Sequence, residues 1–214
     1  MSVPQAIAEA DRFPPAPWRL EGRLDLSVWL VPARDLAFEP PPGWRPLTLF
    51  GRCVVGGVWA RYGPGGDLAY RELAVGVAVR RRARLGVTLP WIWVDSARSR
   101  DGGRSLWAIP KRLASFRQVG GQAEATDRGG RLVAAGGAPI AAVLPGRWAA
   151  ALRIVQPAQG GAVVTRARMK GRPVLGRPAP WRAAGPLSFL DDQAPLLSLR
   201  LERASFRFGD PGRF

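Results

Sequence analysis

Regular alternation of apolar and other residues is the strongest pattern in this chain, and it predicts β-strands. Leu24, Leu26, Val28 and Leu30 occupy every second position after Arg23. Side chains of a strand point to opposite faces in turn, so these four residues share one face of a half-buried strand. This period of two indicates a fold that is rich in sheet.

A second alternating segment lies near the C-terminus, and its pattern contains a slip. Apolar residues hold every second position up to Leu201, and again from Ala204 onward. The parity of the apolar positions changes between these two residues. One extra residue in a strand moves the side chains that follow to the other face, so a β-bulge is expected here.

A β-hairpin is expected in the first half of the chain. Residues 48–62 are rich in β-formers, residues 63–67 read Gly-Pro-Gly-Gly-Asp, and residues 68–82 would form the returning strand. Glycine and proline favour the tight turn that such a hairpin needs. The pair Gly56-Gly57 inside the first strand indicates a bulge or a close backbone approach.

The remaining segments are shorter or less regular. Residues 85–94 predict another apolar strand, residues 96–103 a polar break, and residues 40–43 a loop. Residues 158–180 are rich in glycine, proline and arginine, and they are expected to form a long surface connection. Short strands joined by glycine turns are expected at residues 111–119, 122–126 and 131–135, and an irregular arm at residues 1–17.

Many strands with few helical periods predict a single, mostly β domain over residues 1–214, either closed or sandwich-like. No run of residues approaches the ~18–20 apolar positions of a membrane span. Residues 1–12 contain two acids and no basic segment before an apolar run, so they do not resemble a signal peptide. A soluble cytoplasmic protein without a membrane partner is therefore expected.

The composition excludes several kinds of active site. The chain has no histidine, which rules out histidine-dependent triads, histidine metal ligands and imidazole acid–base chemistry. Its one cysteine, Cys53, forbids an intrachain disulfide and leaves too few thiols for a cysteine-based metal site. Neither a metal nor an organic cofactor is expected.

The formal net charge of +16 raises nucleic acid as a possible partner. The densest basic run, Arg-Arg-Arg-Ala-Arg at residues 80–84, could neutralise phosphates. The other arginines are spread through the chain, and no zinc finger or aromatic RNP motif is present. The pattern therefore favours a solvated basic face over nucleic-acid binding.

Lysine is the rare cation of this chain. Of the 32 lysine and arginine residues only Lys111 and Lys170 are lysines, which leaves 30 arginines. A lysine can lose its proton and attack a carbonyl carbon, which an arginine cannot do. Lys111 follows an apolar run and lies between Pro110 and Arg112, so it is the candidate nucleophile; chance retention of a lysine is the alternative.

The residues around Lys111 resemble the signature of the acetoacetate decarboxylase family. Gly103-Arg104 precedes the run Trp-Ala-Ile-Pro-Lys-Arg-Leu-Ala at residues 107–114, where the family has a glycine-arginine pair before a proline-lysine element. Other segments resemble further family landmarks in the same order. These are Gly22-Arg23, Tyr70-Arg71-Glu72, the strand ending in an aspartate at residues 91–95, and residues 189–196.

The resemblance implies a cone-like closed β-sheet around an apolar pocket, with Lys111 as the lysine that forms a Schiff base. A protonated imine accepts the electrons left by CO₂ loss from a 3-keto acid better than a ketone does. The lysine must be neutral to form it, and desolvation or a neighbouring cation can make it so, a device for which the family's decarboxylase is a standard example. Arg112 is the neighbouring cation and is a candidate catalytic residue. Burial is expected to have the larger effect on the lysine, since neighbours on a strand point to opposite faces.

The resemblance also assigns roles to other residues. Glu72 matches a pocket glutamate that holds or relays a proton, with a surface ion pair as its alternative role. Arg23 is the candidate for binding a substrate carboxylate, because a guanidinium forks onto a carboxylate. Three aromatic residues, Tyr70, Trp107 and Trp93, are expected to line the substrate pocket or the core beside it.

One departure from the family pattern leaves the reaction open. The family's decarboxylase has a second pocket glutamate on the strand before the tyrosine-x-glutamate strand, whereas residues 48–62 contain no acid. The favoured hypothesis is a lyase that decarboxylates a 3-keto acid through a Lys111 imine. The alternatives are an imine-dependent aldolase or dehydratase, and a non-catalytic small-molecule-binding protein. A homo-oligomer is expected, because family members commonly assemble.

Overall fold

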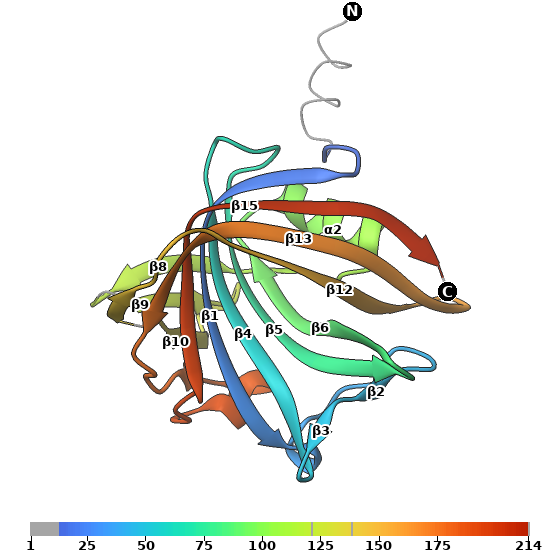
Figure 1. The fold of residues 1–214 in the computed structure, drawn as a ribbon, viewed down its shortest axis with the longest axis horizontal. Helices are drawn as coiled ribbons and strands as arrows, with labels where there is room; N and C mark the ends of the chain where they lie inside the picture. The colour runs from blue at the N-terminus through green and yellow to red at the C-terminus, as the bar shows by residue number, and fades with distance from the viewer. Residues whose placement is uncertain (1–12, 121, 138, 214) are drawn as a thin grey trace, which may run out of the picture.

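The computed structural model describes residues 13–120, 122–137 and 139–213, and most of the expected arm at residues 1–17 lies outside them. Seven long strands form the body of the molecule (Figure 1). They are β1 (Trp18–Pro32), β4 (Arg52–Tyr62), β5 (Tyr70–Arg81), β6 (Arg84–Val94), β12 (Trp148–Ala158), β13 (Gly161–Gly176) and β15 (Leu197–Arg213).

These seven strands form a sheet that closes on itself. Their order is β5-β4-β1-β15-β13-β12-β6, and β6 pairs again with β5. The pairings are antiparallel except for the contact between β12 and β6, which is parallel and joins Ile154 to Val87. In Figure 1 the long strands crowd together at the upper left and fan out toward the right and the bottom, where β2 and β3 lie. The expectation of a mostly β, closed, cone-like sheet is confirmed.

Short elements extend and cover this sheet. The strands β2 (Arg45–Pro46), β3 (Thr48–Leu49), β7 (Arg112–Leu113) and β11 (Ile140–Val143) pair with its members. A separate sheet contains β8 (Ser115–Val119), β9 (Gln122–Thr126), β10 (Leu132–Gly136) and β14 (Arg182–Ala183). The described helices are α2 (Ala97–Trp107), η1 (Ala33–Asp35) and η2 (Gly185–Leu190), and none of them is both long and apolar enough to cross a bilayer.

The closed sheet has apolar residues on both faces, so the molecule has two main cores. One core lies inside the ring and under α2, and includes Leu24, Ile92 and Trp107. The other packs outward-facing residues such as Trp59 and Trp93 against the four-stranded sheet and η2. Burial of both faces explains why β5 has an unbroken run of apolar residues and glycine from Leu73 to Val79 rather than strict alternation.

Several local predictions are confirmed. The segment after Arg23 is part of β1, and β4 and β5 form the expected antiparallel hairpin. The expected bulge is present, because β1 residues Gly22 and Leu24 pair with Ala204 and Leu201, which leaves one extra residue in β15. Arg203 in this bulge has a φ of 46°. The glycine pair in β4 is not a bulge: a Cβ on Gly57 would lie 2.7 Å from the Trp181 ring, so a side chain makes the close approach.

Two local predictions were wrong. The polar break at residues 96–103 is the start of α2, whose N-cap Ser96 accepts a hydrogen bond from the Ser99 backbone N–H. The surface connection expected at residues 158–180 contains β13, which pairs along its length with β12 and β15. Its arginines at positions 166 and 168 are exposed while Thr165 and Ala167 are buried, so charge on one face hid a real strand.

Candidate active site

Lys111 lies immediately before β7, and the backbone around it is tightly held. The backbone N–H of Ile109 donates to the carbonyl of Gly103 at 3.0 Å, and that of Lys111 donates to the carbonyl of Ile109 at 2.8 Å. The Arg104 side chain donates from Nε to the Lys111 carbonyl at 2.8 Å. The end of α2 therefore fixes the chain that carries the lysine, which gives Gly103-Arg104 of the signature a structural role.

The Lys111 amine is buried and hydrogen-bonded inside the closed sheet. The residue is 4% exposed. Its Nζ lies 2.8 Å from Glu72 Oε2, 3.0 Å from Ser99 Oγ and 3.3 Å from the Tyr70 hydroxyl. The amine also lies 4.9 Å from the centre of the Tyr70 ring and 5.9 Å from that of Trp18. Strand β5, helix α2 and the segment before β7 thus meet at this amine.

Two consecutive glycines let α2 come close enough to form this site. A Cβ on Gly103 would lie 2.7 Å from Lys111 Cδ, and a Cβ on Gly102 would lie 2.4 Å from the Trp18 ring. Glycine inside a helix costs about 0.8–1.0 kcal/mol relative to alanine. Packing explains the glycines at both positions, since the lysine side chain and the indole occupy the space that a methyl group would need.

The amine opens onto a cavity of about 320 Å³ inside the ring. Its wall is mostly aliphatic and aromatic, and among the described residues its charged members are Glu72, Lys111 and Arg168. Arg168 is itself exposed on the outer side of β13. The cavity is therefore an apolar chamber with one buried pair of opposite charges.

Burial of the charged Lys111 and Glu72 side chains has a free-energy cost, because both groups lose their hydration. Burial disfavours the ammonium and the carboxylate alike, while their mutual attraction stabilises the pair. Transfer of one proton from Nζ to Oε2 converts them to a neutral amine and a neutral acid without moving either side chain. The arrangement can thus supply a nucleophile and an acid from the same hydrogen bond.

Two tyrosines complete the polar end of the cavity. Burial raises the pKa of Tyr70 well above its usual value, and the negative charge of Glu72 adds to the rise. The pKa of Tyr62 moves in the same direction for the same two reasons. Both phenols therefore remain protonated at neutral pH, and the Tyr70 hydroxyl, 3.4 Å from Glu72 Oε2, is available as a donor.

The other proposed catalytic residue, Arg112, lies on the opposite side of the chain from the amine. Arg112 is exposed, and its guanidinium carbon lies 5.9 Å from the centre of the Trp93 ring. Trp93 pairs with Arg112 across β6 and β7 and belongs to the outer core. Neither side chain lines the cavity, whereas Tyr70 and Trp107 both do.

The structure also separates Arg23 from Lys111. Arg23 alternates with Leu24, which lines the cavity, so its side chain points to the outer face of β1. There its Nε lies 3.2 Å from Asp25 Oδ2, and Asp25 also contacts Arg200. We therefore leave Arg23 out of the proposed site, and its expected role in substrate binding is not supported by its position.

Ser99 and Trp18 are site residues that the sequence analysis did not identify. Ser99 is fully buried and accepts from Lys111 only because residues 97–107 form a helix, which the polar composition concealed. Trp18 packs edge-on against Trp107, with ring centres 4.7 Å apart, just after a proline-rich segment. Gly102, whose Cβ would meet the Trp18 ring, was the available signal for the Trp18 contact.

The position that faces Glu72 on the neighbouring strand carries no acid. Glu72 pairs with Ala60 of β4, and both residues are buried. This agrees with the absence of an acidic residue from residues 48–62. The amine of Lys111 thus has one carboxylate beside it among the described residues.

Sequence comparison identifies the family. A sequence model described as acetoacetate decarboxylase (ADC) matches residues 42–154, which is just over half of the chain. The chain belongs to the acetoacetate decarboxylase family. The matched span contains Tyr70, Glu72, Ser99 and Lys111, whereas Trp18 and Arg23 precede it. No significantly similar sequence is found among curated proteins.

Several solved structures have a fold similar to that of this chain. An acetoacetate decarboxylase from Legionella pneumophila has a TM-score of 0.71 and 17% sequence identity, over 94% of this chain and 88% of that one. The enduracididine biosynthesis enzyme MppR, complexed with the condensation product of pyruvate and imidazole 4-carboxaldehyde, has a TM-score of 0.62 and 17% identity, over 94% and 90%.

A third structure broadens the comparison. An acetoacetate decarboxylase-like enzyme from Sphingomonas wittichii RW1 has a TM-score of 0.60 and 17% identity, covering 93% of each chain. The match extends over nearly the whole chain in all three comparisons. The family match and the fold thus agree on an acetoacetate decarboxylase-like protein.

Proposed function

We propose that this protein is a Schiff-base-forming lyase that decarboxylates a 3-keto acid through Lys111. The observation that carries the proposal is the buried Lys111 amine 2.8 Å from Glu72 at the end of an apolar chamber. A lysine in such surroundings can be a nucleophile, while a purely structural lysine would rarely be buried beside a cavity. The other lysine, Lys170, is exposed on β13.

The proposed reaction begins with proton transfer from Nζ to Glu72. The neutral amine adds to the C3 carbonyl carbon of the substrate, and loss of water gives a protonated imine. The bond between C2 and the carboxylate carbon then breaks, CO₂ leaves, and the electron pair moves to the imine nitrogen to form an enamine. Protonation of the enamine at C2 and hydrolysis of the imine release the ketone and regenerate Lys111.

Four side chains have distinct parts in this scheme. Lys111 is the nucleophile. Glu72 takes the ammonium proton and gives it back when water leaves the adduct, and it then relays the proton that enters at C2 from water. Tyr70 and Ser99 are positioning residues for the amine through hydrogen bonds of 3.3 Å and 3.0 Å. The apolar wall leaves the charged carboxylate of the bound substrate poorly solvated. In the transition state this charge moves toward nitrogen, so the wall disfavours the bound substrate more than the transition state.

A second candidate keeps the imine but joins or dehydrates carbonyl compounds instead of releasing CO₂. The observation in its favour is Ala60, which faces Glu72 and leaves the pocket with one carboxylate beside the lysine. MppR, which shares the fold, was solved with a condensation product of pyruvate. Loss of a carboxylate changes the proton transfers that the pocket can support, and this could favour addition over decarboxylation.

The two reactions differ in whether CO₂ appears, so the test measures gas release and adduct together. The protein is incubated with acetoacetate and, separately, with pyruvate, and each sample is divided between a CO₂ assay and borohydride reduction. CO₂ from acetoacetate with a reduced adduct supports the decarboxylase, and an adduct without CO₂ supports the second candidate. If no keto compound gives an adduct, the remaining hypothesis is a non-catalytic binding protein. The Lys111→Arg variant, which keeps the charge, is the control.

A further inference from the structure

The cavity is closed at the lysine and open at the far end of the ring. On β4, Ala60 and Tyr62 beside Glu72 are buried, whereas Val54, Gly56 and Val58 are half-buried although they face inward. The same change occurs on β1, from the buried Leu24 to the half-buried Leu26 and Val28, and on β5, where Ala78 is half-buried. Solvent therefore reaches the interior from the end opposite Lys111.

The distance between the reactive end and the mouth is large for a short substrate. Ala78 lies six positions after Glu72 on β5, which corresponds to about 20 Å of strand. The cavity of about 320 Å³ lies in the range of roughly 300–1,000 Å³ in which pockets enclose drug-sized ligands. Acetoacetate has seven non-hydrogen atoms and would occupy only the end of the chamber beside the lysine.

The wall between the two ends offers apolar contacts. Among the described residues, the part of the chamber beyond Glu72 toward the mouth is lined by aliphatic side chains and glycines, which include Leu26, Val28, Val54, Gly56, Val58 and Ala78. A polar ligand would lose its hydration there without replacement. An apolar ligand would gain by burial against these side chains.

Gly56 keeps this part of the chamber wide. A Cβ at Gly56 would meet only Leu26 Cδ1, at an ordinary contact distance of 3.6 Å, and the residue has no left-handed φ. Gly76 differs, because its Cβ would lie 2.7 Å from Val87 Cγ1. Packing therefore explains the glycine at position 76 but not the one at position 56, where the missing side chain leaves room for a ligand.

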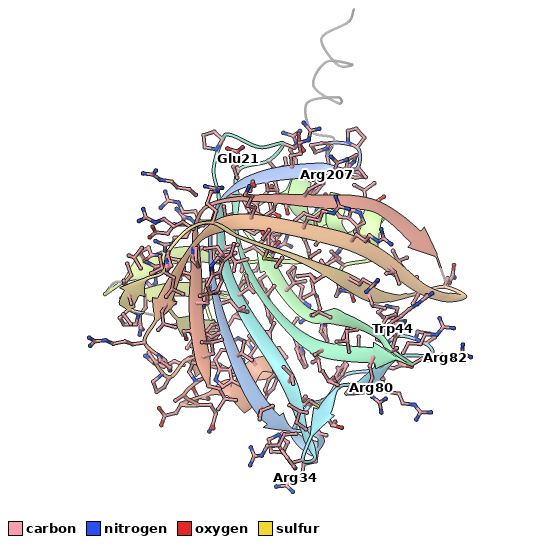
Figure 2. The ribbon with its side chains drawn as sticks, in the orientation of Figure 1. Glu21, Arg34, Trp44, Arg80, Arg82 and Arg207 are labelled. Carbon is pink, nitrogen blue, oxygen red and sulfur yellow. The ribbon has the colours of Figure 1, made fainter. Side chains whose placement is uncertain are left out.

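The rim of the mouth carries positive charge. Arg80 follows Ala78 on the same face of β5 and Arg52 precedes Val54 on the same face of β4, and both arginines are exposed. Figure 2 shows Arg80 near the wide end of the sheet, with Arg82 on the same side and Arg34 at the lower tip. Such a rim attracts anions toward the opening.

We propose that the substrate of Lys111 is a 3-keto acid with an extended apolar chain, whose chain lies along the inner faces of β1, β4 and β5 toward the mouth. This inference rests on the proposed function for the imine at Lys111. The carbonyl carbon must reach Nζ at the closed end, so the rest of the molecule can extend only toward the mouth. The basic rim would draw the acid toward the opening before it enters, and the alkyl chain accounts for the aliphatic wall.

The test is a series of unbranched 3-keto acids of four, six, eight and ten carbons, with two separate readouts. The first is the dissociation constant, measured by calorimetry on the Lys111→Gln variant, which cannot form the imine. The second is the rate of borohydride-trapped adduct in the wild-type protein. We expect the affinity to rise about fourfold per methylene, the fold-change that corresponds to about 0.8 kcal/mol, until the chamber is filled.

Substitutions in the wall locate the chain. Gly56→Leu should reduce the gain in affinity from four to eight carbons at least tenfold. Ala78→Leu, at the half-buried end, serves the same purpose if Gly56→Leu does not fold. Ala151→Leu is the control, because position 151 is exposed and alternates with the inward-facing Leu152; it should leave the whole series unchanged.

The outcomes separate the two proposals. Trapping at Lys111 together with an affinity that does not rise with chain length would overturn the extended-chain substrate and leave the lyase intact. A rising affinity that Gly56→Leu abolishes, without an adduct at any length, would support the chain site and overturn the imine. A rising affinity that neither wall variant changes would place the chain elsewhere and overturn the inference.

Discussion

Lys111 and Glu72 form a buried ion pair, with 2.8 Å between Nζ and Oε2, in a chamber that is otherwise mostly apolar. Each side chain is less than 10% exposed, at 5% for Lys111 and 9% for Glu72. Both groups line the cavity, so a bound ligand could contact the pair. Its chemical consequence is that one proton can move between two groups that are both poorly solvated.

Removing the acid should slow imine formation without abolishing the cavity. In Glu72→Gln the amide keeps the shape of the side chain but cannot accept the proton of Lys111. We expect the borohydride-trapping rate to fall by about 10²–10⁴-fold at neutral pH, the usual contribution of a positioned acid or base. Glu124→Gln is the matched control, because Glu124 also pairs with a basic side chain, that of Arg117, but lies in the four-stranded sheet. Equal rates for the two variants would refute the role of Glu72.

Burial should matter more to the lysine than the neighbouring arginine. Arg112 is exposed beside Trp93, so Arg112→Ala should lower the trapping rate by less than about tenfold, as expected for a screened surface charge. Ile109→Thr places a hydroxyl in the buried wall of the chamber and should lower the rate further. The two rates are measured under the same conditions, and a larger loss in Arg112→Ala would reverse our ordering.

The two helix glycines should give different phenotypes when each is changed to alanine. A Cβ at Gly102 meets the rigid, buried Trp18 ring, so Gly102→Ala should lose about 1–3 kcal/mol of unfolding free energy through overpacking. A Cβ at Gly103 meets the flexible Lys111 side chain, so Gly103→Ala should fold normally but trap substrate more slowly. Denaturant unfolding and trapping rates measure the two effects, and a reversed pattern would contradict the packing.

The buried tyrosines should make the protein sensitive to alkali. The raised pKa of Tyr62 in the folded state means that folding favours the protonated phenol. This contribution to the unfolding free energy is complete below about pH 10, where an unfolded tyrosine titrates, and is lost as the pH rises above that value. We expect Tyr62→Phe to reduce the loss of stability between about pH 9 and 11. An unchanged slope in the variant would mean that other groups cause it.

Much of the closed sheet could be predicted because one face of each strand must be apolar. Alternation identified β1, turn residues identified the hairpin of β4 and β5, and the change of parity after Leu201 identified the bulge. The helix α2 and the strand β13 could not be predicted in this way. Two glycines and a polar composition concealed α2, because the glycines are explained only by tertiary contacts with Trp18 and Lys111. Exposed arginines concealed β13, because its buried residues lie on the other face.

The same parity divides the site residues. Tyr70 and Glu72 are two residues apart on β5, so both side chains point to the inner face, where Lys111 lies. The family resemblance had placed these residues in the same site as Lys111. Arg23 is adjacent to the inward-facing Leu24, so its outward direction was present in the pattern but not used. Ser99 depended on the unrecognised helix, and no local signal connected it to a lysine twelve residues later.

The most direct measurement is the site of reductive trapping in a chain that has two lysines. The protein is incubated with acetoacetate and borohydride, digested, and the modified peptide is located by mass. We expect a single adduct on Lys111, none on the exposed Lys170, and loss of the adduct in Lys111→Arg. Modification of Lys170 alone, or of neither lysine, would show that the buried amine is not the nucleophile.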